Sequence, residues 1–387
     1  MKKNQLLTSL AAMLFISGFT TLKAQNNTFR LADYKNPDYL YQSLDLNFGL
    51  NSNAGIDNVT GFNDGTLKSF SLGSQAGASY SRYFNSAKAQ CEFRAGFNAG
   101  IGSASNNNKY TSGANDIESK VKSMNHYEFL DLAGVHRFYN PSQGYIELNG
   151  ALTIDNRGNS RSWDVNQGGA LSTSQENREK NFSNEIRVAF LIGKGRIEQV
   201  QDARMALYLL DDLYTLSRVK REVTDQDVTA LAQLITKLRY KRFFDYRLRE
   251  IAEITAIDSL LQQSGLVSAA DARYFTSIND NWNYANSPVR ESGHRIYTGL
   301  EAGFNYEYQY TNLDKIVPED LVEERTSKDR MAAFRWVAGY VYEKPTSRYW
   351  QNFAHVNAGV GIKKLYENRV TNLEPAPETE TNLYTDI

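Results

Sequence analysis

The chain has 387 residues, of which 43 are Lys or Arg and 44 are Asp or Glu, so its formal net charge is -1. A balance this close argues against nucleic acid as a partner. The single cysteine, Cys91, excludes an internal disulfide and lies too far from the N-terminus for a lipoprotein signal, whereas 24 tyrosines and 19 phenylalanines are typical of a strand-rich outer-membrane protein.

Residues 1–24 have the features of a secretory signal peptide. Two lysines at positions 2 and 3 precede an apolar run from Leu6 to Phe19, and a small residue, Ala24, occupies the expected cleavage position. No later stretch reaches the roughly 18 consecutive apolar residues of a membrane-spanning helix. We therefore expect an exported protein without a helical anchor.

Apolar and polar residues alternate in nine segments, as they do when one face of a strand meets lipid and the other meets water. The segments are 43–50, 68–84, 87–102, 123–139, 145–155, 180–193, 294–310, 330–343 and 349–363. Segment 123–139 is the least regular, because Tyr127 and Phe129 occupy one phase and Leu130 and Leu132 the other. We expect it to be a strand that carries a β-bulge.

The connections between the segments differ in length. Short turns at 85–86, 139–142 and 344–347 alternate with long polar stretches at 51–66, 103–122, 156–179 and 311–329. In outer-membrane barrels short turns face the periplasm and long loops face outside. We expect the same orientation here, with 156–179 as a mobile loop rather than a packed plug.

The polar phase of the strands carries charges of both signs. The residues predicted to line the lumen are Lys88, Glu92, Arg94, Glu147, Glu185, Arg187, Arg295, Glu301 and Arg335. Such residues fill a narrow barrel with ion pairs or line a water channel in a wide one. The bias toward one sign that a selective pore more often shows is absent from this set.

The periodicity changes from two to three or four residues after Gly193, where a short periplasmic turn is due. Apolar stripes predict four helices, at about 197–217, from Thr224, at about 243–264 and from Ser268. Thr224 has Asp227 three residues later, like a capping box, and Ser268 has Asp271. Because four such helices can bury their stripes in one another, we expect an inserted periplasmic helical domain.

Six basic residues gather within this insert: Lys237, Arg239, Lys241, Arg242, Arg247 and Arg249, with Asp245 among them. One interpretation is a docking surface for a periplasmic protein, peptidoglycan or anionic lipid headgroups. The other is a solvated helix junction with local ion pairs, which we favour because mixed charges commonly face water.

No motif of a nucleophile elbow, a metal-binding histidine pair, a phosphate-binding loop or a cysteine cluster is present. The four histidines, His126, His136, His294 and His355, lie in different predicted strands, and His355 is the one most expected to face polar surroundings. We expect no catalytic residue, no metal and no cofactor.

The strand count of nine is odd, whereas bacterial single-chain barrels have even counts. Either the chain is truncated or one strand has been missed or wrongly assigned. We favour truncation, with 380–387 as the beginning of a tenth strand.

A resemblance to a known group rests on the segments Gly193-Lys194-Gly195-Arg196-Ile197-Glu198, Asp202-Ala203-Arg204, Asp211-Asp212-Leu213 and Arg242-Phe243-Phe244-Asp245-Tyr246-Arg247. Together with the signal peptide they make the chain resemble Bacteroidetes-type outer-membrane β-barrel proteins with a helical periplasmic insert. The resemblance covers nearly all of the chain and implies no reaction or ligand.

These observations predict a mainly β fold: an antiparallel transmembrane β-barrel of at least nine strands, incomplete at its C-terminal end, with an inserted α-helical periplasmic domain. The expected segments are the signal peptide 1–24, barrel strands 25–193, the helical insert 194–292, and barrel strands with an outer loop 293–387. We expect an outer-membrane protein in contact with lipid, porin-like or structural and without enzymatic activity. Its insert docks a periplasmic protein or peptidoglycan. The alternatives are an outer-membrane enzyme acting on lipid or surface polymer, and a surface adhesion or binding protein.

Overall fold

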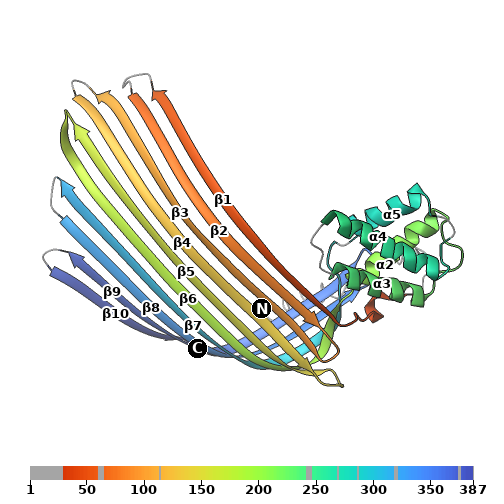
Figure 1. Ribbon diagram of the computed structural model, residues 1–387. Coiled ribbons are helices and arrows are strands. Elements are labelled where there is room, and N and C mark those ends of the chain that lie inside the picture. The colour runs from red at the N-terminus through yellow and green to blue at the C-terminus, as the bar shows by residue number, and fades with distance from the viewer. Residues whose placement is uncertain are drawn as a thin grey trace, which may run out of the picture.

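The computed structural model describes residues 29–59, 65–112, 115–240, 246–267, 270–285, 287–317, 321–373 and 376–386, so the predicted signal peptide lies outside it. Ten antiparallel strands form one sheet in which each strand pairs with its neighbours in sequence (Figure 1). The strands are β1 (Tyr39–Val59), β2 (Gly65–Asn85), β3 (Ala89–Ser112), β4 (Asn115–Tyr139), β5 (Gly144–Gln167), β6 (Ala170–Gln199), β7 (Glu291–Val317), β8 (Leu321–Pro345), β9 (Gln351–Leu373) and β10 (Ala376–Asp386).

The sheet is a strongly curved trough with a helical domain at one end (Figure 1). Within the described ranges β1 pairs with β2 alone and β10 with β9 alone, so the trough has two edges. The predicted fold class, a mainly β fold of consecutive antiparallel strands with inserted helices, is confirmed. The expected tenth strand is also present, and it begins at Ala376 rather than near residue 380.

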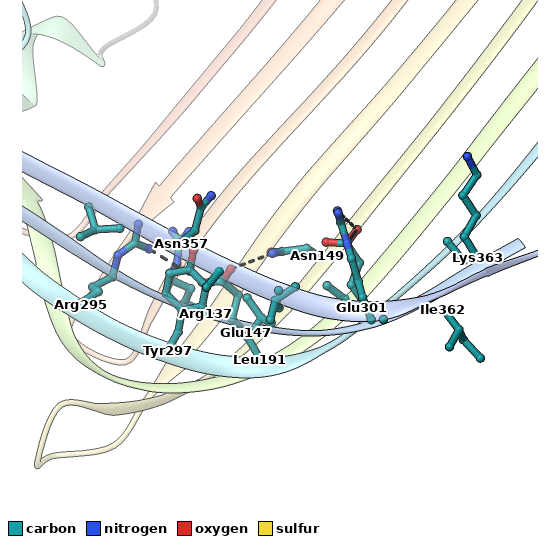
Figure 2. A pocket seen from close by; sticks show the side chains of 18 residues that line it. Arg137, Glu147, Asn149, Leu191, Arg295, Tyr297, Glu301, Asn357, Ile362 and Lys363 are labelled. Atoms are coloured by element: carbon teal, nitrogen blue, oxygen red, sulfur yellow. Dashed lines mark hydrogen bonds and ion pairs between the residues drawn. The ribbon is translucent and has the colours of Figure 1, made fainter. Parts of the chain in front are cut away.

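The strand register separates two faces of the sheet. Leu148, Phe190, Leu300, Trp336 and Val360 form one continuous row across β5 to β9, and each side chain is about half exposed or more. Neighbouring residues on the strands point to the opposite side, as Ile362 and Lys363 do in Figure 2. We call the face that carries the apolar row the convex face and the other the concave face.

At the far end of the trough, strands continue where the sequence predicts long loops. The stretches 51–66, 103–122, 156–179 and 311–329 are mostly strand, and β5 and β6 are joined only by Gly168 and Gly169, whose φ values are 59° and 83°. Both residues thus adopt the left-handed backbone that a two-residue hairpin turn requires. The expectation of a mobile loop at 156–179 was wrong, because both faces there are mainly polar, which weakens the alternation while the backbone hydrogen-bond ladder continues.

The predicted bulge in 123–139 was also wrong. Residues 123–138 pair one to one with β3, and residues 123–139 pair one to one with β5. Leu130 and Leu132 lie on the convex face, whereas Tyr127 and Phe129 lie on the concave face, and the Tyr127 hydroxyl donates to Gln75 Oε1 at 3.4 Å. The irregular pattern therefore arises from aromatic residues on the inner side of a regular strand.

Four helices follow β6: α2 (Gln201–Thr215), α3 (Asp225–Arg239), α4 (Tyr246–Gln263) and α5 (Ala272–Tyr284). Their apolar stripes meet in one core that includes the fully buried Leu209, Leu213, Leu231, Ile235 and Ile257. Among the described helices none is both long and apolar enough to span a membrane. The insert therefore has its own hydrophobic core.

The border between β6 and α2 differs from the prediction. The strand does not end at Gly193 but continues to Gln199, and the helix begins at Gln201 rather than near Ile197. The polar residues after Gly193 break the apolar alternation, yet their backbones still pair with β7. The apolar alternation therefore ends at Gly193, six residues before strand pairing ends at Gln199.

Two glycines shape this extension. Gly195 and Gly293 have φ values of +100° and +129°, and a Cβ atom at either position would lie 2.2 or 2.0 Å from a backbone carbonyl oxygen of the opposite strand. Only glycine adopts this backbone without strain. Gly195 thus redirects the strand without ending it.

The helix starts are partly as predicted. Thr224 and Asp227 form a complete capping box at the start of α3, which confirms that expectation. The fourth helix, however, begins at Ala272, with Asp271 as its N-cap, which accepts a hydrogen bond from Tyr274 N at 3.0 Å, while Ser268 lies outside the described residues. A single aspartate is sufficient to cap that helix.

The segment before β1 ties the helices to the sheet. A short 3-10 helix, η1 (Leu31–Asp33), inserts Leu31 into the helical core, and Tyr34 follows it there. On the sheet side, Ser292 Oγ donates to Ala32 O at 2.9 Å. The helical domain is therefore anchored by the chain that precedes the first strand as well as by β6 and β7.

Candidate functional site

The concave face carries a buried carboxylate near the helical end. Glu147 is 5% exposed, and its Oε2 lies 2.5 Å from Arg137 Nε and 3.8 Å from Arg295 Nη1 (Figure 2). Asn149 Nδ2 donates to its other oxygen at 2.8 Å. The three partners come from β4, β5 and β7, so one acidic side chain connects strands that are not all neighbours.

The Glu147 cluster lines a hollow in the concave face, and a second ion pair lies farther along this hollow. Arg335 Nε on β8 donates to Glu301 Oε1 on β7 at 2.9 Å, and Lys363 on β9 lines the same space. The lining residues include four basic side chains, Arg137, Arg295, Arg335 and Lys363, against two acidic ones, Glu147 and Glu301. The hollow is thus polar, with a surplus of positive charge and with its carboxylates engaged.

The other residues predicted to line the lumen, apart from Lys88, also lie on the concave face. Glu92 and Arg94 lie on the concave face of β3, and on β6 Arg187 lies 2.5 Å from Glu185, with their side chains 55% and 40% exposed. Lys88 is the exception, because it lies in the exposed turn between β2 and β3. Its backbone carbonyl accepts a hydrogen bond from Tyr139 N at 2.8 Å. Because β3 begins only at Ala89, the alternation of that strand does not extend to the Lys88 side chain.

The four histidines lie on β4, β7 and β9. His355 Nε2 lies 2.6 Å from Glu343 Oε1 on the concave face, as expected for a polar environment, while His136 stacks on Phe138 on the convex face. In the part of the chain that is described, no three His, Cys, Asp or Glu side chains are grouped so as to hold a metal ion. The His355–Glu343 pair links neighbouring strands.

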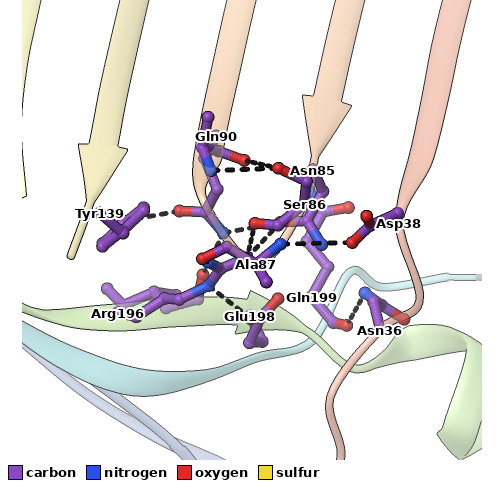
Figure 3. Close-up of polar contacts among 12 residues, drawn as sticks. Asn36, Asp38, Asn85, Ser86, Ala87, Gln90, Tyr139, Arg196, Glu198 and Gln199 are labelled. Atoms are coloured by element: carbon purple, nitrogen blue, oxygen red, sulfur yellow. Dashed lines mark hydrogen bonds and ion pairs between the residues drawn. The ribbon is translucent and has the colours of Figure 1, made fainter. Parts of the chain in front are cut away.

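Arg196, near the end of β6, reaches across the trough to the turn between β2 and β3 (Figure 3). Its Nη2 donates to Asn85 Oδ1 and Ser86 O, both at 2.9 Å, and its Nε lies 2.6 Å from Glu198 Oε1. Its guanidinium also lies over the Tyr139 ring. This arginine therefore connects the end of β6 to strands that are distant from it in the sheet order.

The helical domain touches the sheet on two sides. The Tyr240 ring, after α3, stacks on Tyr39 of β1 with centroids 4.5 Å apart, while Asp211 of α2 pairs at 2.6 Å with Arg348 in the turn between β8 and β9. Tyr208 donates to Arg348 O at 3.2 Å. The domain therefore spans the helical end of the trough from the first strand to the eighth.

A cavity of about 490 Å³ lies where the domain meets β1 and β2. We call it the junction pocket, and its lining residues are Tyr41, Tyr83, Gln199, Gln201, Arg239, Tyr240, Arg249, Trp282 and Asn283. The lining is therefore made of aromatic rings, amides and two guanidinium groups, and it holds no carboxylate among these residues.

Buried acids behind the pocket hold its arginines in place. Asp202 is 2% exposed and lies 3.0 Å from Arg239 Nη1, and Glu253 is equally buried and lies 2.7 Å from Arg249 Nε. The second oxygen of Glu253 accepts from Trp282 Nε1 at 2.8 Å. Burial raises the pKa of Asp202, against the opposing effect of the Arg239 charge. Charge-assisted hydrogen bonds to the buried carboxylates of Asp202 and Glu253 thus hold the two arginines of the pocket wall in place.

The predicted docking residues divide into three groups. Arg239 and Arg249 line the junction pocket, and Lys237 is exposed on α3. Lys241 and Arg242 lie outside the described residues, as does the side chain of Arg247 in α4. Sequence reasoning missed the aromatic lining, because those rings come from β1, β2, α5 and the residue after α3, and no local spacing connects them.

Comparison with known proteins gives little. No protein-family model and no curated protein matches the chain. Among solved structures, OpdQ of Pseudomonas aeruginosa is similar at 8% identity over 90% of this chain and 98% of that chain, with a TM-score of 0.13. OccK3 (OpdO) of the same organism gives 7% identity over 89% and 94%, with a TM-score of 0.14. OccAB2 of Acinetobacter baumannii gives 9% identity over 89% and 98%, with a TM-score of 0.12. Scores this low carry no argument about the fold or the activity of this chain.

Proposed function

We propose that the chain is an integral outer-membrane β-barrel protein, porin-like or structural, whose helical domain lies in the periplasm and docks a partner there. The observation that carries this proposal is the apolar row on the convex face. In water, five large apolar side chains exposed side by side across five strands cost free energy, whereas a lipid environment would cover them.

The strand lengths agree with this placement. A tilted strand needs about 9–11 residues to cross a bilayer, and β6 has 30. Most of the large exposed apolar side chains lie in the half nearer the helical domain, whereas the far half has fewer of them, such as Ile56, Trp163 and Leu171, and is mainly polar. We infer that the far half projects beyond the membrane surface as paired strands.

The orientation follows from the connections. At the helical end the turns, apart from the helical domain itself, directly follow the apolar half of the strands, whereas at the far end the strands continue past that half as long hairpins. Short periplasmic turns and longer extracellular connections are typical of barrels of this class. The helical domain therefore belongs to the periplasmic side, where peptidoglycan and soluble proteins are available as partners.

The concave face supports a water-exposed interior. Its ion pairs are satisfied within the hollow, and the surplus of basic side chains leaves Lys363 available to water or to a solute. Conductance across a planar bilayer after reconstitution would identify a porin, and absence of conductance would leave the structural role.

The membrane assignment is tested by placing a charge on each face of one strand. Val360→Lys puts an ammonium on the convex face of β9, and Asn357→Lys puts the same group on its concave face. A lysine near the bilayer midplane costs about 2–4 kcal/mol, so V360K should sharply reduce the folded, heat-modifiable fraction recovered from outer membranes. N357K should leave that fraction near the wild-type level.

The controls for this test are simple. Both variants introduce the same side chain, three residues apart in one strand, so a general effect of an added lysine on expression cannot explain a difference between them. Equal yields of the two variants, or recovery of the wild-type protein in the soluble periplasmic fraction, would overturn the membrane assignment.

A further inference from the structure

A band of basic and aromatic residues crosses the convex face of β6 to β9 at the point where its apolar part ends. We call it the outer band, and it consists of Lys180 of β6, Tyr306 and Tyr308 of β7, Lys328 and Arg330 of β8, and Lys364 of β9. We propose that the outer band binds the phosphate groups of an anionic lipid in the outer leaflet of the membrane. The inference rests on the proposed function, because that function places the convex face in lipid.

The strand register places the outer band on the convex face. Tyr306 and Tyr308 lie six and eight residues after Leu300 of the apolar row, so the alternation of β7 places all three on one side. Tyr306 pairs with Arg330, and Tyr308 pairs with Lys328. The two remaining lysines, on β6 and β9, likewise lie an even number of residues from the members of the apolar row on their own strands.

The outer band begins where one bilayer thickness of apolar strand ends. From Ile296 to Phe304 the convex positions of β7 are apolar except for Thr298, and these nine residues match the roughly 9–11 that cross a bilayer. Tyr306 occupies the next convex position, on the side away from the helical domain. Tyrosine is enriched at membrane interfaces, because its ring is apolar and its hydroxyl is polar.

The four basic side chains of the outer band are exposed, and none of them takes part in an ion pair within the described part of the chain. Lys328 Nζ lies 5.9 Å from the centre of the Tyr308 ring, and Arg330 Cζ lies 5.8 Å from the centre of the Tyr306 ring. A cation–π contact orients a basic group without neutralising it. The positive charge of the outer band therefore stays available to a ligand.

No acidic residue occupies the convex positions around the outer band, which lie within 180–186, 304–310, 326–332 and 364–370. The next acidic residue on this face of β8 is Glu324, whose Oε1 accepts a hydrogen bond from the Tyr310 hydroxyl at 3.2 Å. Like charges without a nearby carboxylate repel one another, and an anion bound between them would offset that repulsion.

Exposed arginines of the concave face show the opposite arrangement. Arg157 lies 2.7 Å from Asp155 Oδ2, and Arg369 lies 3.6 Å from Glu367 Oε2. Arg325 contacts a carboxylate two residues away on its own strand in the same way. Positive charge on that face is compensated within the protein, whereas the outer band lacks such compensation.

A phosphorylated lipid fits the charge of the outer band and its position together. Its acyl chains would cover the apolar rows below the band, and its phosphate oxygens would accept charge-assisted hydrogen bonds from the lysines and the arginine. Inorganic phosphate would use the charges but not the adjoining apolar face, and an acidic polysaccharide would have no reason to bind at the edge of that face. Both alternatives are outcomes of the experiment below.

The experiment is a lipid titration of the full chain in detergent micelles, with bound lipid measured by native mass spectrometry. The probes are a lipid A that carries phosphate groups and the same lipid after their removal. We expect the wild-type protein to bind the phosphorylated lipid at least roughly tenfold more tightly. The triple variant Lys328→Gln, Arg330→Gln, Lys364→Gln should lose on the order of a hundredfold in affinity for it, because each basic group near a lipid surface contributes about fivefold.

A matched control removes the same number of charges from the other face. The triple variant Arg157→Gln, Arg325→Gln, Arg369→Gln replaces three concave side chains that are 65%, 67% and 60% exposed, and it should bind the phosphorylated lipid like the wild type. Heat-modifiable migration verifies that each variant is folded. If the outer-band triple variant fails to fold, Lys364→Gln alone, with an expected loss of about fivefold, keeps the test decisive.

Four results would overturn the inference: equal affinity of the wild type for the two lipids, equal losses in the two triple variants, displacement of the lipid by inorganic phosphate at the same concentration, or tighter binding of polygalacturonate than of the lipid. Failure of the membrane assignment has a different signature, namely wild-type protein in the soluble periplasmic fraction or equal yields of V360K and N357K. Failure of lipid binding alone would leave both of those results as expected for a membrane protein.

Discussion

Replacement of Arg196 by glutamine tests how the helical end of the trough is held together. The Arg196 and Glu198 side chains are 12% and 13% exposed, and the guanidinium also donates to the turn between β2 and β3 through Asn85 Oδ1 and Ser86 O. Removal of one partner of a buried ion pair costs about 3–5 kcal/mol, since the other charge remains buried and unpaired. Here that charge is on Glu198, whose Oε2 has no hydrogen-bond partner within the described part of the chain.

The same strand offers a control of matched chemistry. Arg187 and Glu185 are also two residues apart and 2.5 Å from each other, but their side chains are 55% and 40% exposed. An exposed pair contributes about 0–1 kcal/mol, so Arg187→Gln should have little effect on the free energy of unfolding.

The assay is urea unfolding of the protein in detergent, followed by the loss of heat-modifiable migration, with the free energy obtained from the midpoint and slope. We expect Arg196→Gln to lose several times more stability than Arg187→Gln. Equal losses for the two variants would refute the argument, because burial and the contacts to the β2–β3 turn are the features that distinguish the pairs.

Two further predictions concern the backbone and the helical domain. Gly195→Ala should destabilise the fold by about 1–3 kcal/mol, because the φ of residue 195 is +100° and an added Cβ would lie 2.2 Å from a carbonyl oxygen. Gly150→Ala is the control, since the space around its Cβ is open, and it should be neutral or slightly stabilising in the same urea assay. Asp227 has a pKa held below its usual value by hydrogen bonds from Arg221, so its contribution to stability is present above about pH 4 and is lost as the pH falls further. Asp227→Asn should therefore lower the thermal midpoint of the helices at pH 7 and lessen its further drop in acid, as followed by circular dichroism at 222 nm. Parallel acid curves for the wild type and the variant would contradict this.

Much of the strand architecture could be predicted from alternation alone. Segments such as 87–102 and 180–193 have a period of two because one face of each strand is apolar, and the register later placed Leu148, Phe190 and Val360 on that face together. The capping box at Thr224 was equally local, since its two hydrogen bonds join residues three apart in the chain.

The pattern failed where both faces of a strand have the same character. In 156–167 both faces are mainly polar, so strand pairing leaves little mark on the order of apolar residues, and the sequence predicts a loop there. In 123–139 Tyr127 and Phe129 are apolar on the concave side, so a regular strand resembled one with a bulge.

The sequence by itself determined which residues share a face in the alternating segments and that a helical insert follows the sixth strand, because both properties depend on neighbours two to four positions away. Only the tertiary structure decided which distant groups meet. Arg137 and Arg295 converge on Glu147 across strands, and Tyr41 and Arg249 come to line one pocket through the docking of the helical domain. These contacts depend on strand register and domain placement, which are set by the packing of the whole sheet rather than by any local spacing.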